Sequence, residues 1–116
     1  MADYKFVVLT NPVEGREDEY NDWYDNRHLN DVLKAPGFWR AQRFENADPL
    51  ADAPPRYKYL AIYDFESDDL AKTFETFFAL TGTGEMPISD AMDRDVSPIV
   101  YKVRGPAREK PRPGGK

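Results

Sequence analysis

Residues 57–82, YKYLAIYDFESDDLAKTFETFFALTG, carry the strongest secondary-structure signals in the chain. Over residues 57–65 side chains alternate between two faces, which is typical of a β-strand. One of these faces is formed by Tyr57, Tyr59, Ala61, Tyr63 and Phe65. The other face is formed by Lys58, Leu60, Ile62 and Asp64.

A helix is expected directly after this strand. Ser67 is a residue type suited to an N-cap, and Asp68 and Asp69 would lie in the first turn, where acidic side chains are favoured. Apolar residues then recur at helical spacing, and Gly82 ends the pattern. These apolar residues are Leu70, Phe74, Phe77 and Phe78.

Four further elements are expected on either side of this strand–helix pair. Residues 4–10 and 38–46 are rich in β-branched and aromatic side chains and predict strands, and residues 96–103 predict a last strand, which Pro98 places at a sheet edge or a bulge. A helix is expected from about residue 16 to 28 or beyond, before Pro36 and Gly37. Residues 47–55 are a proline-rich loop, too long for a tight hairpin.

The resulting order, βαββαβ, predicts a ferredoxin-like α+β fold, in which two helices lie on one face of a four-stranded antiparallel sheet. The other face would carry large apolar side chains that nothing in the chain covers. A symmetric homodimer, joined sheet to sheet, is the simplest way to bury that face. We expect Tyr59, Ala61 and Tyr63, or their neighbours, to lie in the dimer interface.

Composition limits the possible functions. The 116 residues suffice for one domain, contain no cysteine, and include no apolar run long enough to span a membrane. We expect no secretory signal and a cytoplasmic location. The net charge is −5, although residues 104–116 alone carry +4, so the acidic domain, residues 1–103, argues against nucleic-acid binding. The basic, Pro- and Gly-rich residues 104–116 are expected to form a disordered tail.

His28 is the only histidine in the chain and the leading candidate for chemistry. On a helix Tyr20, Tyr24, His28 and Val32 form one line in steps of four, with Trp23 beside it. Asp31 lies three residues further on and could fix the imidazole tautomer, while Tyr24 could donate to a developing oxyanion. The alternatives are that His28 is a helix C-terminal residue favoured by the dipole and that Asp31 is a cap.

One straight helix would also bury Leu29 and Leu33, which fall nearly opposite Tyr20. We therefore expect a break near Leu29–Asn30, followed by a short turn that Asn30 or Asp31 caps.

Other side chains are weaker candidates for substrate binding. Asn11 could offer an amide, but Asn before Pro is also an ordinary turn. Arg40 could bind a carboxylate or enolate, although pairing with an acid such as Asp64 or Glu45 is the favoured interpretation. Trp23, Tyr63 and Phe78 could line a pocket or belong to the core. One histidine and scattered acids do not predict a metal site.

Residues 10–45, TNPVEGREDEYNDWYDNRHLNDVLKAPGFWRAQRFE, carry a family resemblance. An acid, the pair WY, a histidine after three residues, and PGF leading into a strand together resemble the EthD-like branch of the dimeric α+β barrel superfamily. That superfamily also includes small polyketide cyclases, muconolactone-type isomerases and antibiotic-biosynthesis monooxygenases. The resemblance implies a dimer with a pocket between sheet and helices in each subunit.

The resemblance also implies a function. Many such enzymes use no metal or organic cofactor, and the histidine that ends the first helix often acts as acid or base; this role falls on His28, with Trp23 and Tyr24 as pocket neighbours. The leading hypothesis is a cofactor-independent lyase or isomerase acting on a small oxygenated aromatic or lactone-like catabolite. The alternatives are a non-catalytic accessory or ligand-binding protein of an oxidative pathway, and a monooxygenase without cofactor or with haem.

Overall fold

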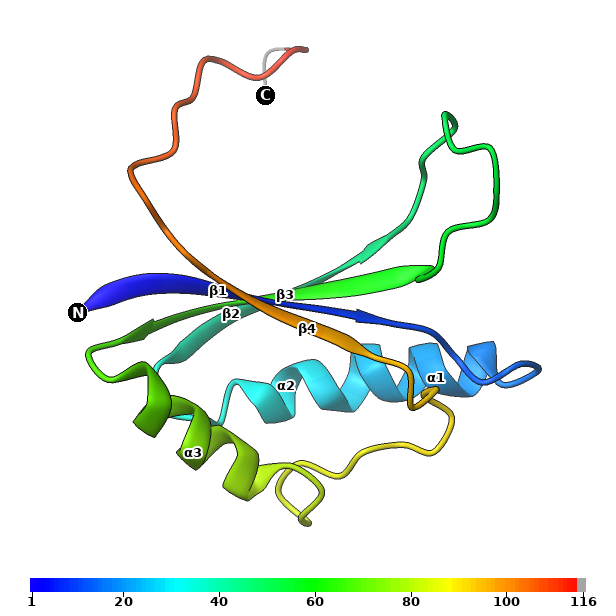
Figure 1. The fold of residues 1–116 in the computed structure, drawn as a ribbon, viewed down its shortest axis with the longest axis horizontal. Helices are drawn as coiled ribbons and strands as arrows, with labels where there is room; N and C mark the ends of the chain where they lie inside the picture. Colours follow the sequence, from blue (N-terminus) through cyan, green and yellow to red (C-terminus); the bar gives the residue numbers. More distant parts are fainter. Residues whose placement is uncertain (115–116) are drawn as a thin grey trace.

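The computed structural model describes residues 1–114 and has the expected ferredoxin-like architecture (Figure 1). Its elements follow the order βαββαβ, with the first helix divided into three consecutive segments. The elements are β1 (Ala2–Thr10), α1 (Glu17–Trp23), η1 (Tyr24–His28), α2 (Leu29–Val32), β2 (Phe38–Glu45), β3 (Tyr59–Ser67), α3 (Leu70–Leu80) and β4 (Ser97–Lys102).

The four strands form one antiparallel sheet in the order β2-β3-β1-β4. All helical segments lie on the same face, and the opposite face is left uncovered by them (Figure 1). Strand β4 is at an edge, which confirms the edge position expected from Pro98, since proline cannot donate to a neighbouring strand.

Strand β3 begins and ends two residues later than the predicted 57–65. Its pairing with β1 runs in continuous register from Tyr59 opposite Thr10 to Ser67 opposite Ala2. Because Ser67 still belongs to the strand, it does not cap α3; Asp69 does, and its side chain accepts a hydrogen bond from the Lys72 amide. The predicted N-cap was therefore wrong by two residues.

The first helix does not break near Leu29–Asn30 as expected. Instead, a π-helical turn, η1, joins α1 directly to α2. A π turn takes more residues than an α turn and so rotates the following side chains relative to a continuous α-helix. As a result His28 and Val32 are buried, whereas Leu33 is exposed.

The expected interface residues Tyr59, Ala61 and Tyr63 face the helices and are at most 8% exposed, so this set was wrong, whereas the neighbours that the prediction also allowed, Leu60 and Ile62, lie on the uncovered face. The alternation of side chains along β3 predicted correctly which residues share a face. It did not predict which of the two faces the helices cover. The uncovered face has a mainly apolar set of side chains from all four strands. This set, called the open sheet face below, comprises Val7, Leu9, Phe44, Leu60, Ile62, Ile99 and Tyr101.

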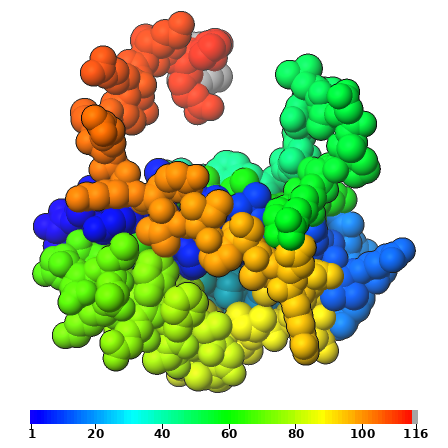
Figure 2. Space-filling model, in the orientation of Figure 1, coloured from blue at the N-terminus to red at the C-terminus, as the bar shows by residue number. Residues whose placement is uncertain are grey.

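Two segments rise from the sheet on the side of this open face (Figures 1 and 2). One is the loop between β2 and β3, and the other is the chain after β4, where residues 104–114 are exposed and form no helix or strand. Among the described residues, no helix has the length and apolar character needed to cross a membrane.

Candidate functional site

A cavity of about 180 Å³ lies between the sheet and the helices. Its floor comes from β1 and β3, one wall from η1 and another from α3, and the segment after α3 closes it. Only four of its lining side chains are polar: Tyr24, His28, Tyr63 and Thr81. Phe78, Ile88 and Val96 line it while remaining exposed to solvent by 57%, 39% and 36%, so they mark its mouth.

His28 is the most unusual polar residue of this cavity. The side chain is 8% exposed, and its Nδ1 atom is buried without a hydrogen-bond partner among the described residues. Burial lowers the pKa of His28 from 6.5 to about 4, even though the nearby Asp31 carboxylate raises it. The imidazole is therefore neutral at pH 7, and one ring nitrogen is free to accept a proton.

The local fold explains how a histidine comes to lie there. Residues Tyr24–His28 form the π turn, and both end residues of this turn are buried against the sheet. The wider turn keeps His28 on the same side of the helix as Tyr20 and Tyr24. Single π turns within α-helices occur frequently at functional sites.

Two tyrosine hydroxyls accompany the imidazole. The Tyr63 hydroxyl donates to the Tyr24 hydroxyl over 3.4 Å, and the His28 ring packs edge-on against both phenol rings. Burial raises the pKa of both phenols, so each keeps its proton at neutral pH. The arrangement thus combines one neutral base with two neutral hydrogen-bond donors.

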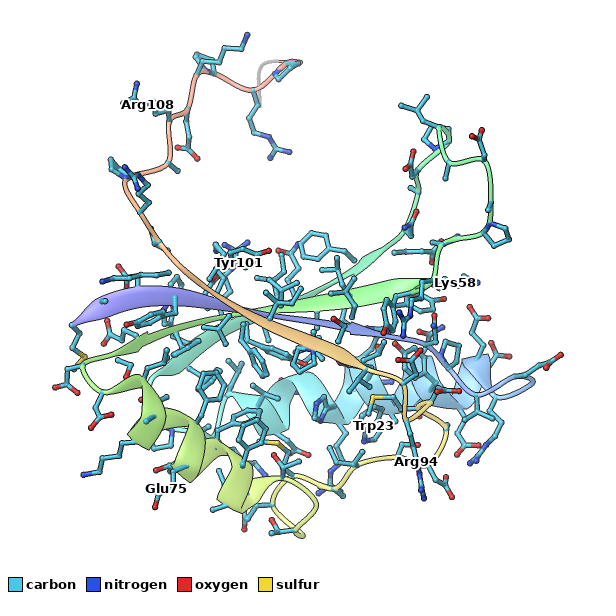
Figure 3. The ribbon with its side chains drawn as sticks, in the orientation of Figure 1. Trp23, Lys58, Glu75, Arg94, Tyr101 and Arg108 are labelled. Atoms are coloured by element: carbon cyan, nitrogen blue, oxygen red, sulfur yellow. The ribbon has the colours of Figure 1, made fainter. Side chains whose placement is uncertain are left out.

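Trp23 holds the imidazole from its other side. Its ring stacks on His28 with 4.6 Å between ring centres, and its Nε1 donates to the Pro87 carbonyl over 3.2 Å. Trp23 lies below the sheet in Figure 3, beside the segment that closes the cavity. It therefore positions His28 and does not itself line the cavity.

Asp31 lies near His28 but is engaged elsewhere. Its carboxylate, 6% exposed, pairs with Arg27 at 3.0 Å and Lys34 at 3.2 Å. Although burial raises the pKa of Asp31, the hydrogen bonds from both cations hold it below its ordinary value. The structure therefore does not provide the His28–Asp31 hydrogen bond that the spacing allows.

Like Trp23, two other proposed substrate-binding residues, Asn11 and Arg40, lie outside the cavity lining. The Asn11 side chain bonds the loop backbone, donating to the Arg56 carbonyl at 2.6 Å and accepting from the Lys58 amide at 2.7 Å. Arg40 lies on the open sheet face, 3.8 Å from Asp64, which confirms the favoured interpretation that it pairs with an acid. Tyr63 and Phe78, in contrast, do line the cavity.

The segment between α3 and β4 forms a part of the site that the sequence did not indicate. Bridges pair Thr81 with Met86 and Pro12 with Met92, so the segment folds back under the sheet without a helical turn. Met86 is buried, and Met92 packs against the core. A feature of the sequence that could have indicated this part of the cavity lining is the recurrence of four apolar residues in an otherwise polar stretch: Met86, Ile88, Met92 and Val96.

The lining of the cavity gives no support for haem. None of its side chains is a lysine or arginine that would pair with the propionates of a porphyrin, and the volume is below the roughly 300 Å³ at which pockets for larger ligands begin. Among residues 1–114, no three His, Asp or Glu side chains gather where they could hold a metal ion.

Comparison with known proteins gives one curated relative. No family model matches the chain. Core atranone cluster (CAC) protein 1 of Stachybotrys chlorohalonatus (strain IBT 40285) is 31% identical over 99 residues, which are 84% of this chain and 40% of that protein. The chain therefore spans about two fifths of the length of this relative.

Solved structures share the fold at low sequence identity. SnoaB from Streptomyces nogalater, described as a cofactor-independent oxygenase, superposes with a TM-score of 0.63 at 15% identity, over 94% of this chain and all of that chain. An EthD-like protein from Ralstonia eutropha JMP134 gives 0.59 at 15%, over 89% and 91% of the two chains. A dimeric ferredoxin-like protein from Thermobifida fusca YX gives 0.54 at 13%, over 88% and 92%. The chain thus has the ferredoxin-like fold found in EthD-like and oxygenase proteins.

Proposed function

We propose that the protein is a cofactor-independent lyase or isomerase in which His28 takes a proton from a carbon atom next to a carbonyl group. The observation that carries this proposal is the buried, neutral imidazole with an unpartnered Nδ1 in a cavity whose other polar groups are hydroxyls. A buried polar atom without a partner is costly, and such atoms often mark functional sites.

The reaction would proceed by proton transfer through the imidazole. The C–H bond breaks, its proton moves to His28, and its electron pair forms an enolate whose oxygen accepts a hydrogen bond from Tyr24. Tyr63 donates to Tyr24 and so strengthens that bond. Return of the proton to another carbon gives an isomer, and expulsion of a leaving group from the neighbouring carbon gives a lyase product.

With a pKa of about 4, His28 is a weak base in the free protein. The negative charge that develops on the substrate lies beside the ring during the reaction, and an adjacent anion favours imidazolium. In a cavity with few polar groups this attraction is stronger than in water. The pKa of His28 therefore rises as the enolate forms.

The cavity limits the substrate to a compact apolar molecule. A cavity of about 150 Å³ holds a benzene molecule, and the 180 Å³ available here suits a single ring with one or two oxygen substituents. The absence of a cationic side chain from the lining disfavours carboxylated substrates. An oxygenated aromatic or a lactone fits these constraints.

Deuterium exchange would test the proposal without knowledge of the product. Single-ring ketones and lactones that carry a hydrogen on the carbon next to the carbonyl group are incubated with the protein in D2O and analysed by mass spectrometry. We expect deuterium uptake that falls at least 100-fold in His28→Gln and about 10-fold in Tyr24→Phe, because removal of a general base or an oxyanion donor typically costs such factors. Lys72→Gln, exposed near the start of α3 and outside the cavity lining, is the matched control.

Exchange that persists in a folded His28→Gln variant would refute the role of the imidazole. Ligands that raise the melting temperature but are neither exchanged nor converted would identify the protein as a binding or accessory protein.

A second candidate is a cofactor-independent oxygenase, because SnoaB is described as one and shares the fold. Its first step would be the same proton transfer, after which the carbanion would pass electrons to O2 instead of recovering a proton. Oxygen consumption coupled to substrate loss, measured with an oxygen electrode, distinguishes the two. Turnover that is unchanged under argon supports the lyase or isomerase.

We also infer that the protein acts as a homodimer joined through the open sheet face. Charges on this face are already paired, since Asp64, 6% exposed, contacts both Lys5 and Arg40. A paired cluster amid apolar side chains is suited to an interface between copies. The Thermobifida fusca protein with this fold is described as dimeric.

A further inference from the structure

The two segments that rise from the sheet stand on either side of the open sheet face. The loop that contains residues 47–55 leaves one end of this face, and residues 104–114 leave the opposite end (Figure 1). Space-filling atoms show both segments standing clear of the body, with an open space between them (Figure 2). Any second copy seated on the open sheet face would occupy that space.

The lengths of both segments imply contact with such a copy. Packed sheets lie about 10 Å apart, whereas the 11 described residues of the tail can extend to roughly 35 Å. A tail that rises from the edge of the interface therefore passes alongside the partner.

The tail and the outer part of the loop, residues 47–55, carry opposite charge, while Arg56 and Lys58 at the base of the loop already pair with Asp95 and Glu17. Residues 104–114 hold Arg104, Arg108, Lys110 and Arg112 against one acid, Glu109, and therefore carry +3. Residues 47–55 hold Asp48 and Asp52 without a basic residue, and carry −2. Within residues 1–114 none of these charged side chains forms an ion pair.

Symmetry allows two arrangements of these segments in a face-to-face dimer. A two-fold axis along the strands brings the two tails to the same end of the interface, so that +3 faces +3. An axis across the strands brings the tail of one protomer to the end where the partner's loop lies, so that +3 faces −2. Charge favours the second arrangement.

We infer that the tail, residues 104–114, of each protomer clasps the loop, residues 47–55, of a second copy of this chain. The inference rests on the proposed dimer and adds its orientation and a role for both segments. Figure 3 supports the geometry, since Arg108 stands on the tail above the sheet and Tyr101 lies on the same side of the sheet.

Disulfide cross-linking tests the clasp cleanly, because the chain has no cysteine of its own. Separately purified Ala51→Cys and Ala107→Cys proteins are mixed, allowed to exchange subunits and oxidised. We expect a covalent dimer that forms at least 10-fold faster in the mixture than from either protein alone. The control is a mixture of Ala107→Cys with Ala71→Cys, which is exposed on α3. Its cross-linking rate measures random collision between molecules.

A charge-reversed loop, Asp48→Lys with Asp52→Lys in the Ala51→Cys protein, should slow the mixed cross-link several-fold, and salt should remove the difference. If Ala107→Cys forms a covalent dimer with itself faster than with Ala51→Cys, the clasp is overturned, and the two-fold axis runs along the strands. Light scattering separates the two proposals: a dimer without the mixed cross-link overturns only the clasp, whereas a monomer overturns both.

Discussion

The guanidinium of Arg43 stacks on the ring of Tyr24, with 4.4 Å between the guanidinium carbon and the ring centre. The same group lies 5.1 Å from the Tyr20 ring and 4.9 Å from the Tyr59 ring. Its terminal nitrogens donate to Asp25 at 2.8 Å and to Asn21 at 2.9 Å. Arg43 therefore joins β2 to the first helix directly behind a tyrosine of the proposed site.

Replacing Arg43 with lysine should destabilise the protein by about 2 kcal/mol. Lysine retains the charge but loses the planar stacking surface and the two simultaneous hydrogen bonds of the guanidinium. Urea unfolding at fixed protein concentration measures this loss. The control is Arg16→Lys, whose exposed guanidinium pairs with Glu19 and Asp90 without an aromatic ring beneath it, and for which we expect a much smaller loss. Equal effects at both positions would show that the tyrosine contacts contribute nothing.

His28 should titrate with a midpoint near pH 4 instead of 6.5, because burial disfavours the imidazolium. Since the chain has one histidine, its imidazole signals in an NMR titration need no assignment. A midpoint at or above 6 would mean that the ring is solvated and would remove the basis of the proposed site.

The same shift makes stability depend on pH. Between pH 6.5 and about 4 the unfolded chain binds a proton at His28 that the folded chain does not, so this contribution to stability is complete above pH 6.5 and is lost as the pH falls. The loss amounts to about 3 kcal/mol. It should appear as a pH-dependent difference between the unfolding free energies of the wild type and His28→Gln.

Gly37 should tolerate no side chain. Its φ is +90°, and a Cβ atom there would lie 2.5 Å from the Glu66 carbonyl oxygen. Gly37→Ala should cost about 3 kcal/mol, from backbone strain together with displacement of β3. Gly15, with φ of +82° and open space around it, isolates the strain alone, and Gly15→Ala should cost about 1 kcal/mol. Similar melting temperatures for the two variants would contradict the clash.

Local patterns in the sequence were sufficient for the element order, and they singled out His28 as a candidate, which the structure places in the lining of a cavity. Alternation around Tyr63 and the helical spacing of Phe74 and Phe77 depend on neighbours in the chain, and the fold confirms both elements. The predicted boundaries of β3 were two residues too early, because the ends of the strand depend on its pairing with β1. That pairing cannot be predicted from the sequence of β3 alone.

The residues that the sequence missed act through distant contacts. Arg43 is one arginine among several in a strand, and only packing against Tyr20, Tyr24 and Tyr59 distinguishes it. The sequence predicted an irregularity in the first helix, because Leu29 and Leu33 fall on the side opposite Tyr20. It did not show that the backbone would form a π turn there. Spacing paired Asp31 with His28, three residues away. Lys34 is also three residues away and Arg27 four, and both carry the charge that decides which partner Asp31 takes.

The open sheet face should control assembly, and Ile62→Glu tests this. Ile62 lies in the central strand β3, opposite Val7 of β1 and Gln42 of β2, and a glutamate there would bring a charge into an apolar interface. The nearest cations on this face, Lys5 and Arg40, already pair with Asp64. We expect light scattering to show a dimer for the wild type and a monomer for Ile62→Glu, with circular dichroism unchanged because the helices pack on the other face. Leu33→Glu introduces the same charge on an exposed helical position and should remain dimeric. A dimeric Ile62→Glu protein would mean that the copies meet through another surface, and the tail and loop could not then clasp the partner across this face.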